Sequence, residues 1–363
     1  MRLRLRDLDR ALERAETSIA LLDRCRPRNL TAELERLRRD WRRGNRRAPR
    51  FDYSAPPLPV GLREALARLE AVAVRAGPWG TLYAGRAHEL MLEAAIAENL
   101  HRAEARSWAR QRFQLPRDAH AERAEDWSRE WCRAQPEAPD ELRVSSDDER
   151  DPASLVSVLG RMLGAERLPF RVCAVPELTS VAATGDGVVL VRAGWRGRPQ
   201  DVERIAVHEV HGHVLPRQRA RREALGLFRV GSAGGCDDEE GRALLMELRA
   251  GLMGAHRRAE LGRRHLAAVS VCQGATFVET VELLLALPAP LDTALHIAAR
   301  VHRGGGLARE IVYLPALSRV QSNLAEEPDL ERWMERGRIG IDAARVLARL
   351  GDPPSNLALP DAA

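Results

Sequence analysis

The feature that most constrains the fold of this chain is the helical spacing of its apolar residues. In residues 5–25, apolar side chains recur every three or four positions, as they do on the buried face of an amphipathic helix. The same spacing returns over 31–43, over most of 60–135, over 155–163 and from about 195 to 350. It predicts a chain that is mainly helical.

One short region breaks this pattern. The runs FRVCAV (170–175) and SVAATGDGVVLVRAG (180–194) are typical of strands, and Gly185-Asp186-Gly187 inside the second run is suited to a hairpin turn. We therefore predict the α+β class, mainly α-helical, with a small antiparallel or mixed sheet. That sheet would precede the helix that carries most of the chemistry.

A polar, proline-marked stretch at 136–152 is the best candidate for a domain boundary. We expect an N-terminal helical region over 1–150 that packs on a core formed by 151–350. The remaining residues, 351–363, are expected to form a loose tail.

The composition excludes several kinds of function. All 57 basic residues are arginine, because the chain has no lysine, and 52 acidic residues nearly balance them, which disfavours a nucleic-acid partner. The five cysteines are widely spaced without a CxxC pair, which argues against a disulfide framework. The N-terminus is charged where a signal peptide would be apolar, and no stretch is apolar for long enough to cross a membrane. We expect a cytoplasmic protein with no membrane partner, and the oligomeric state stays open.

The strongest local signal is the segment VERIAVHEVHGHVLP, which holds three of the ten histidines within six residues. These are His208, His211 and His213, and Glu209 follows the first of them. Apolar residues surround the group on nearly all sides of the projected helix, which predicts a buried helix whose polar side chains need partners. A metal ion would satisfy them. The alternative is a set of partly exposed histidines near the end of a helix.

The spacing leaves open which two histidines would bind a metal. At ~100° per residue, His208 and His211 lie about 60° apart around an ideal helix, and His208 and His213 about 140° apart. The first pair suits a regular helix. The second becomes feasible if the helix bulges or unwinds at Gly212, shortly before Pro216.

A third ligand is available in the next predicted helix, whose first turn carries the four acids of 237–240. Acids in a first turn also complement the helix dipole, so capping is an equally good explanation. Four adjacent carboxylates nevertheless repel one another unless a cation is near. Glu240 shares a helix face with Ala243, Leu244 and Glu247, so it could point inward. Gly241 leaves room for another helix.

In its motifs the chain resembles the zinc-dependent tyrosine carboxypeptidase family, which includes the microtubule-detyrosinating enzymes and bacterial relatives named for a QEGLA motif. HEVHGH at 208–213 matches the family's HExxxH, and Glu240-Gly241 matches its Glu-Gly pair. Further matches are RPRNLTAEL and APRFDY near the N-terminus, QGATFVETVELL at 273–284 and RGGGLAREIVYLPAL at 303–317. The likeness covers most of the chain.

The resemblance implies a zinc peptidase core over 151–350, with Glu209 as the general base. The Zn²⁺ ligands that it implies are His208, His213 and Glu240. The chain departs from the family pattern at Arg242, which follows the Glu-Gly pair. It departs also at His211, where relatives usually have glycine, and at His302, where they tend to have an aromatic residue.

The leading prediction is a zinc-dependent metallocarboxypeptidase that hydrolyses C-terminal residues of peptides or proteins. Arg303 is the candidate for binding the substrate carboxylate and Tyr313 for donating a hydrogen bond to the oxyanion, although glycines after a helix often simply end it. A hairpin edge near 188–191 would align the peptide by strand addition. The alternative is a non-enzymatic zinc-containing regulatory or scaffold protein. Glu209 disfavours it, because a structural site does not need an uncoordinated carboxylate beside a ligand.

Overall fold

The computed structural model describes residues 5–100, 102–113, 117–133 and 143–352. Helices dominate these ranges, and the strands all lie between residues 144 and 197. The prediction of an α+β protein that is mainly helical is therefore confirmed. None of the described helices combines the length and hydropathy that a membrane span requires.

The regular elements described in the N-terminal part are all helices. Its elements are α1 (Leu5–Ile19), α2 (Leu21–Arg24), α3 (Leu30–Arg42), α4 (Leu62–Val74), α5 (Gly77–Glu98), α6 (Ala103–Phe113) and α7 (Ala119–Arg133). Ala20 has a left-handed conformation, with φ of 38°, so the single helix predicted for 5–25 is two helices. α4 ends at Val74 and α5 begins at Gly77, so only a short turn separates these two helices.

Two small sheets follow. Their strands are β1 (Val144–Ser145), β2 (Arg171–Val175), β3 (Ala182–Thr184), β4 (Val188–Arg192) and β5 (Arg196–Gly197), and α8 (Leu155–Ala165) separates β1 from β2. β1 pairs with β5, while the other three strands form a mixed sheet in the order β2-β4-β3. β3 and β4 run antiparallel around the predicted turn, and β2 runs parallel to β4.

This strand order corrects one expectation. The segment 188–191 was expected to be the sheet edge that receives a peptide, but β4 has a hydrogen-bonded neighbour on both sides. The parallel strand β2, which precedes the hairpin in the chain, pairs with β4 along all five of its residues. The outer strand of the hairpin is β3, so the available edge lies on 182–184.

The sheet packs against one long helical segment that changes its hydrogen-bonding pattern in the middle. The segment consists of α9 (Pro199–Val207), the π-helix η1 (His208–Val214) and α10 (Leu215–Ala220). Val189 and Val191 of β4 are fully buried, in one apolar cluster with Ile205 of α9 and Val210 of η1. The alternating side chains of the strand thus hold the histidine helix beneath the sheet.

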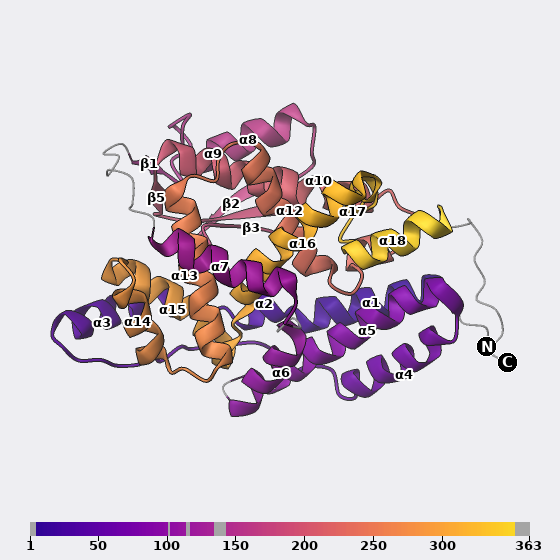
Figure 1. Ribbon diagram of the computed structural model, residues 1–363, viewed down its shortest axis with the longest axis horizontal. Helices are drawn as coiled ribbons and strands as arrows, with labels where there is room; N and C mark the ends of the chain where they lie inside the picture. Colours follow the sequence, from indigo (N-terminus) through magenta and orange to yellow (C-terminus); the bar gives the residue numbers. More distant parts are fainter. Residues whose placement is uncertain (1–4, 101, 114–116, 134–142, 353–363) are drawn as a thin grey trace.

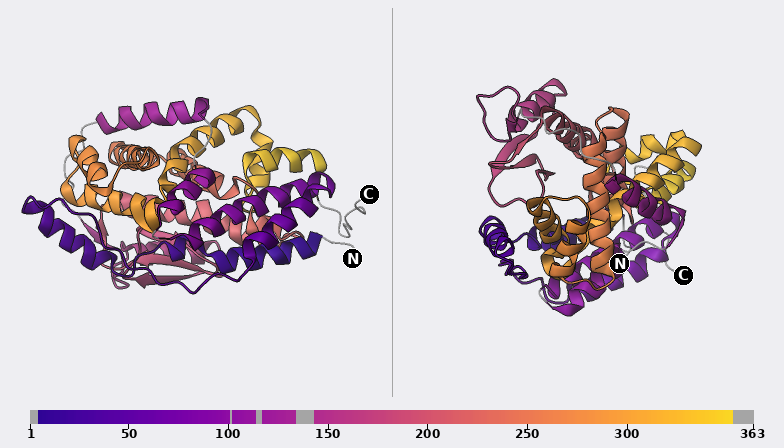
Figure 2. Two further views of the ribbon diagram at one scale, coloured as in Figure 1. Left: turned by 90° about the horizontal axis from the view of Figure 1, so that it is seen from below. Right: turned by 60° about the vertical axis from the view of Figure 1, so that its left-hand side comes forward.

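The C-terminal part is again helical. Its elements are α11 (Leu227–Val230), α12 (Gly235–Arg249), α13 (Ala255–Cys272), α14 (Phe277–Ala286), α15 (Leu291–Gly306), η2 (Arg309–Val312), α16 (Tyr313–Glu326), η3 (Pro328–Leu330), α17 (Glu331–Met334) and α18 (Ile341–Leu350). Figure 1 shows α16 between the strands β2 and β3 and the helices α1, α4, α5 and α6 at the bottom of the view, with α8 and α9 above the strands and α12 beside them. In the left view of Figure 2, α7 (magenta) lies on the side of the molecule opposite the sheet.

The main core unites segments that are far apart in the sequence. A single cluster of buried apolar side chains contains Leu8 of α1, Leu90 of α5, Leu244 of α12 and Leu317 of α16. The division into 1–150 and 151–350 stays a prediction. The predicted tail lies outside the described residues from 353 onward.

Candidate functional site

The histidine motif occupies the π-helix. In this helix type the N–H of a residue bonds to the carbonyl five positions earlier, as the N–H of Leu215 does with Val210. Residues five apart are therefore stacked, and the Nε2 atoms of His208 and His213 lie 3.3 Å apart. The bulge at Gly212 that this pairing needs is present, and the described groups that could hold a metal do not include His211.

Close packing against α12 explains two glycines. A Cβ added at Gly212 would lie 2.5 Å from the Cβ of Ala243, far inside the normal contact distance. A Cβ at Gly241 would lie 2.5 Å from the backbone carbonyl of Ala316 on α16. The π-helix, α12 and α16 thus approach one another at glycines, which brings α12 next to the histidines.

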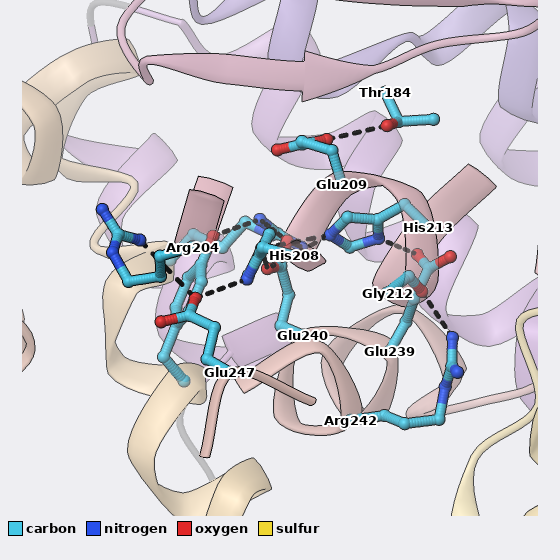
Figure 3. Close-up of polar contacts among 12 residues, drawn as sticks. Thr184, Arg204, His208, Glu209, Gly212, His213, Glu239, Glu240, Arg242 and Glu247 are labelled. Carbon is cyan, nitrogen blue, oxygen red and sulfur yellow. Dashed lines mark hydrogen bonds and ion pairs between the residues drawn. The ribbon is translucent and has the colours of Figure 1, made fainter. Parts of the chain in front are cut away.

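Glu240 of α12 completes a group of three. Its Oε2 atom lies 3.6 Å from Nε2 of His208 and 3.8 Å from Nε2 of His213. One ligand atom of each residue lies within 4.8 Å of the other two. Figure 3 shows the three side chains directed toward one another from η1 and α12. The structure therefore brings together the three metal ligands that the sequence resemblance implied.

A carboxylate faces the outer nitrogen of each histidine. Nδ1 of His208 lies 2.7 Å from Oε1 of Glu247, and Nδ1 of His213 lies 3.4 Å from Oε2 of Glu239 (Figure 3). The hydrogen bond between Glu247 and Nδ1 of His208 orients that ring, so that its Nε2 faces the other two residues of the group. Two imidazole nitrogens and a carboxylate oxygen thus converge on one point, an arrangement that suits a cation, which would displace the ring proton from Nε2 of His208. The donor set of two imidazoles and one carboxylate is one that zinc favours.

The charges around this group act strongly on its members. Burial alone would lower the pKa of His208, but hydrogen bonds with Glu240 and Glu247 outweigh burial and raise its pKa to about 9. Burial would raise the pKa of Glu240, yet Arg309 and the two histidines hold that pKa well below its usual range. The carboxylate of Glu240 is therefore ionised and able to act as a ligand.

The four consecutive acids that suggested a cation each have a partner of their own. Arg112 donates to Asp237 at 2.9 Å, and Arg319 donates to Asp238 at 2.9 Å. Glu239 faces His213, and Oε1 of Glu240 accepts from both terminal nitrogens of Arg309 at 3.1 Å. Successive helical positions point in different directions, so the four acids do not share one ion.

Glu209 lies beside the group but outside it. Its Oε2 accepts a 2.7 Å hydrogen bond from the hydroxyl of Thr184, the last residue of β3 (Figure 3). Only 5% of Glu209 is exposed. A hydrogen bond thus connects the edge strand β3 to the carboxylate of Glu209.

These residues line a cavity of about 700 Å³. Its walls include β3, the histidine helix, the N-terminus of α12, parts of α1 and α2, and the arginine-rich segments of α13, α15 and η2. Arg303 and Tyr313 both line it, as do Arg264 and Arg300. Both predicted substrate-contacting residues therefore face the same cavity as the group of three.

Arg303 is positioned by an interruption in α15. It has a non-helical conformation (φ −53°, ψ 153°), and Gly304 and Gly305 after it have positive φ. Nη1 of Arg303 donates to the hydroxyl of Thr179 at 2.6 Å, and Nη2 lies 3.8 Å from Glu310. The glycines thus end the regular helix, which is the simpler of the two explanations given for them above. Arg303 nevertheless lines the cavity.

Reasoning from the sequence missed several residues of the site. Glu247 shares a helix face with Glu240, so the helical spacing could have drawn attention to it as a partner of a histidine. No sequence signal pointed to Thr184, because its role depends on the order of the strands. The same holds for Arg309, which binds Glu240 from a separate 3₁₀ turn and donates to the Tyr313 hydroxyl at 3.3 Å.

In this chain a helix that carries two histidines and a glutamate thus lies below the outer strand of a small sheet. A family described as microtubule-associated tyrosine carboxypeptidase matches residues 40–353, and the chain belongs to this family. The family is one of carboxypeptidases. No curated protein gave a significant match.

Proposed function

We propose that the protein is a zinc-dependent carboxypeptidase that removes residues from the C-termini of peptides or proteins. The observation that carries the proposal is the convergence of two imidazole nitrogens and a carboxylate oxygen beside Glu209, an ionisable group outside the ligand set. Membership of a carboxypeptidase family supports the same reaction. The preference for an aromatic terminal residue rests on the family alone.

The residues that would hold Zn²⁺ are His208, His213 and Glu240. When bound, zinc would polarise the scissile carbonyl and lower the pKa of a coordinated water. Glu209 takes a proton from the attacking water and later delivers it to the leaving amine. The hydroxyl of Thr184 holds one oxygen of this carboxylate, so that the other oxygen is free to carry the proton.

The substrate would lie along β3. One side of this strand pairs with β4, and the other side lines the cavity. A peptide in extended form can pair with such an edge by main-chain hydrogen bonds, which are independent of its sequence. Alignment on β3 would place the scissile bond next to Glu209, because Thr184, the last residue of β3, is hydrogen-bonded to Glu209.

Two cavity residues would recognise the end of the substrate. A guanidinium binds a terminal carboxylate through two parallel hydrogen bonds, and Arg303 is the proposed group. Arg264 is a second guanidinium that lines the cavity, and its Nε and Nη2 have no hydrogen-bond partner among the described residues. The hydroxyl of Tyr313 lies within 3.5 Å of donors on Arg300 and Arg309, which leaves its own hydrogen for the oxyanion.

We place this activity in the cytoplasm. All five cysteines are free thiols, and three of them are buried, as expected of a protein in a reducing compartment.

The test uses the full chain, its zinc content determined by elemental analysis, and two peptides that differ only in a free or an amidated C-terminus. We expect one zinc per chain and stepwise loss of C-terminal residues from the free peptide only, followed by mass spectrometry. Glu209→Gln should keep the zinc and lose about 10²- to 10⁴-fold in rate. Protein that binds no zinc, or that cleaves both peptides internally at equal rates, would show the proposal to be wrong.

A further inference from the structure

The π-helix that pairs the histidines runs into a residue that cannot donate a backbone hydrogen bond. Pro216 lies two positions after Val214, the last residue of η1, and has no N–H. In the π pattern the carbonyl of His211 would accept from residue 216. In the α pattern the carbonyl of Gly212 would accept from that same residue. Either pattern therefore leaves a carbonyl without its normal donor.

The N–H of the preceding residue cannot replace it. The N–H of Leu215 is already bonded to the carbonyl of Val210, five residues earlier. Gly212 itself is buried against α12, where Ala243 lies close to it. A buried carbonyl without a partner is costly, so a donor must come from elsewhere in the fold.

Arg242 of α12 supplies that donor. Its Nη1 donates to the carbonyl of His211 at 3.3 Å, and its Nη2 donates to the carbonyl of Gly212. Figure 3 shows the side chain reaching from α12 to the π-helix next to His213. Only 3% of Arg242 is exposed, so its donors are not offered to bulk solvent. The guanidinium thus serves the two carbonyls that directly precede His213.

We propose that Arg242 is a positioning residue, which holds the π-helix in the pattern that places His213 opposite His208. Among the described residues, its hydrogen bonds go to the two backbone carbonyls and to none of the three ligand side chains, and it is not one of the residues that line the cavity. It stabilises the backbone at the place where Pro216 has removed the backbone donor. Its effect on metal binding rests on the proposed function, whereas its effect on the helix does not.

The first test measures Zn²⁺ affinity of the full chain by competition with a chelator, without substrate. Arg242→Met keeps the aliphatic length and removes the donors, and we expect affinity to fall about 10-fold or more, as when partners that orient a ligand are lost. Arg242→Lys keeps one donor and should recover part of this loss. Arg249→Met is the matched control on the same helix, since Arg249 pairs with Glu331 instead, and it should bind zinc normally.

The second test needs no metal and no activity. Urea unfolding of the zinc-free protein is compared for the wild type, Arg242→Met, Pro216→Ala and the double variant. Alanine at 216 restores an N–H that can reach the carbonyl of His211 or Gly212, so Arg242→Met should shift the denaturation midpoint less in that background. The double variant also serves if Arg242→Met alone does not fold.

Two results would overturn the inference. Equal midpoint shifts in the two backgrounds would mean that Arg242 and Pro216 do not act on the same carbonyls. Unchanged zinc affinity in Arg242→Met would remove the positioning role. If neither the wild type nor any variant binds zinc, the proposed function is wrong. The inference about Arg242 and Pro216 is then still tested by the unfolding comparison.

Discussion

Single carboxylates in this site act through the histidines that they orient. Glu247 is fully buried, and its Oε1 accepts from His208 while Arg257 donates to both of its oxygens, at 2.8 and 2.9 Å. The arginine fixes the carboxylate, and the carboxylate fixes the ring. A chain of two charged groups therefore determines where Nε2 of His208 points.

The contacts from Arg257 through Glu247 to His208 lead to a prediction for Glu247→Gln. The neutral amide holds the Nδ1 hydrogen of His208 less firmly, so zinc affinity should fall by about 10- to 100-fold in chelator competition. Glu260→Gln is the matched control, because Glu260 also accepts from Arg257, at 2.9 Å, and among the described residues it makes no hydrogen bond to His208 or His213. Equal losses in the two variants would mean that the effect passes through Arg257 and not through the ring.

At the scale of elements, the contact between the π-helix and α12 decides the geometry of the site. The two helices meet where Gly212 faces Ala243, and the same stretch of α12 carries Glu239 and Glu240. A larger residue at either position would separate the helices. The histidines and the third ligand would then move apart together.

We expect Gly212→Ala to destabilise the protein by about 1 to 3 kcal/mol, as overpacking of a dense contact does. Its added Cβ would lie 3.1 Å from the Cα of Ala243 as well as 2.5 Å from its Cβ. Urea denaturation measures the change. Gly160→Ala on α8 is the comparison, because an added Cβ there meets nothing within 4 Å, and it should be neutral or stabilising by up to about 1 kcal/mol. Similar losses from both would contradict the steric explanation.

At the scale of the whole molecule, the helices around the cavity bury histidines that the site does not use. Burial lowers the pKa of buried His265 and of half-buried His302 to about 4 each, with Arg106 adding to the effect for His302. An unfolded histidine has a pKa near 6.5. Between these values the unfolded chain binds more protons than the folded chain, so stability falls as the pH falls.

His265 offers the cleanest test, since only 3% of it is exposed. Lowering the pH from 7 to 5 should reduce its contribution to the free energy of unfolding by about 2 kcal/mol. Urea unfolding at both pH values should therefore show a smaller pH effect in His265→Gln than in the wild type, because all other groups cancel in the comparison. The same pH effect in both proteins would mean that His265 is protonated in the fold.

The sequence by itself determined the helical class and the place of the sheet, and its resemblance to a known family pointed to the candidate ligands. Helices arise from a local repeat of apolar residues, and a short chemical motif lies within one such repeat, so neighbouring residues suffice to recognise them. The Glu-Gly pair on the next helix was recognisable for the same reason. Glu247, on the same helical face as Glu240, was within reach of that reasoning.

Only the tertiary structure decided which histidines pair and which strand forms the edge. The ideal helix favoured His208 with His211, whereas packing at Gly212, the missing N–H of Pro216 and the donors of Arg242 produce a π-helix that pairs His208 with His213. Likewise β4 became central because β2 pairs beside it. These outcomes depend on contacts between residues that are distant in the chain. The energies of such contacts outweigh small local preferences, and the local spacing of residues does not encode them.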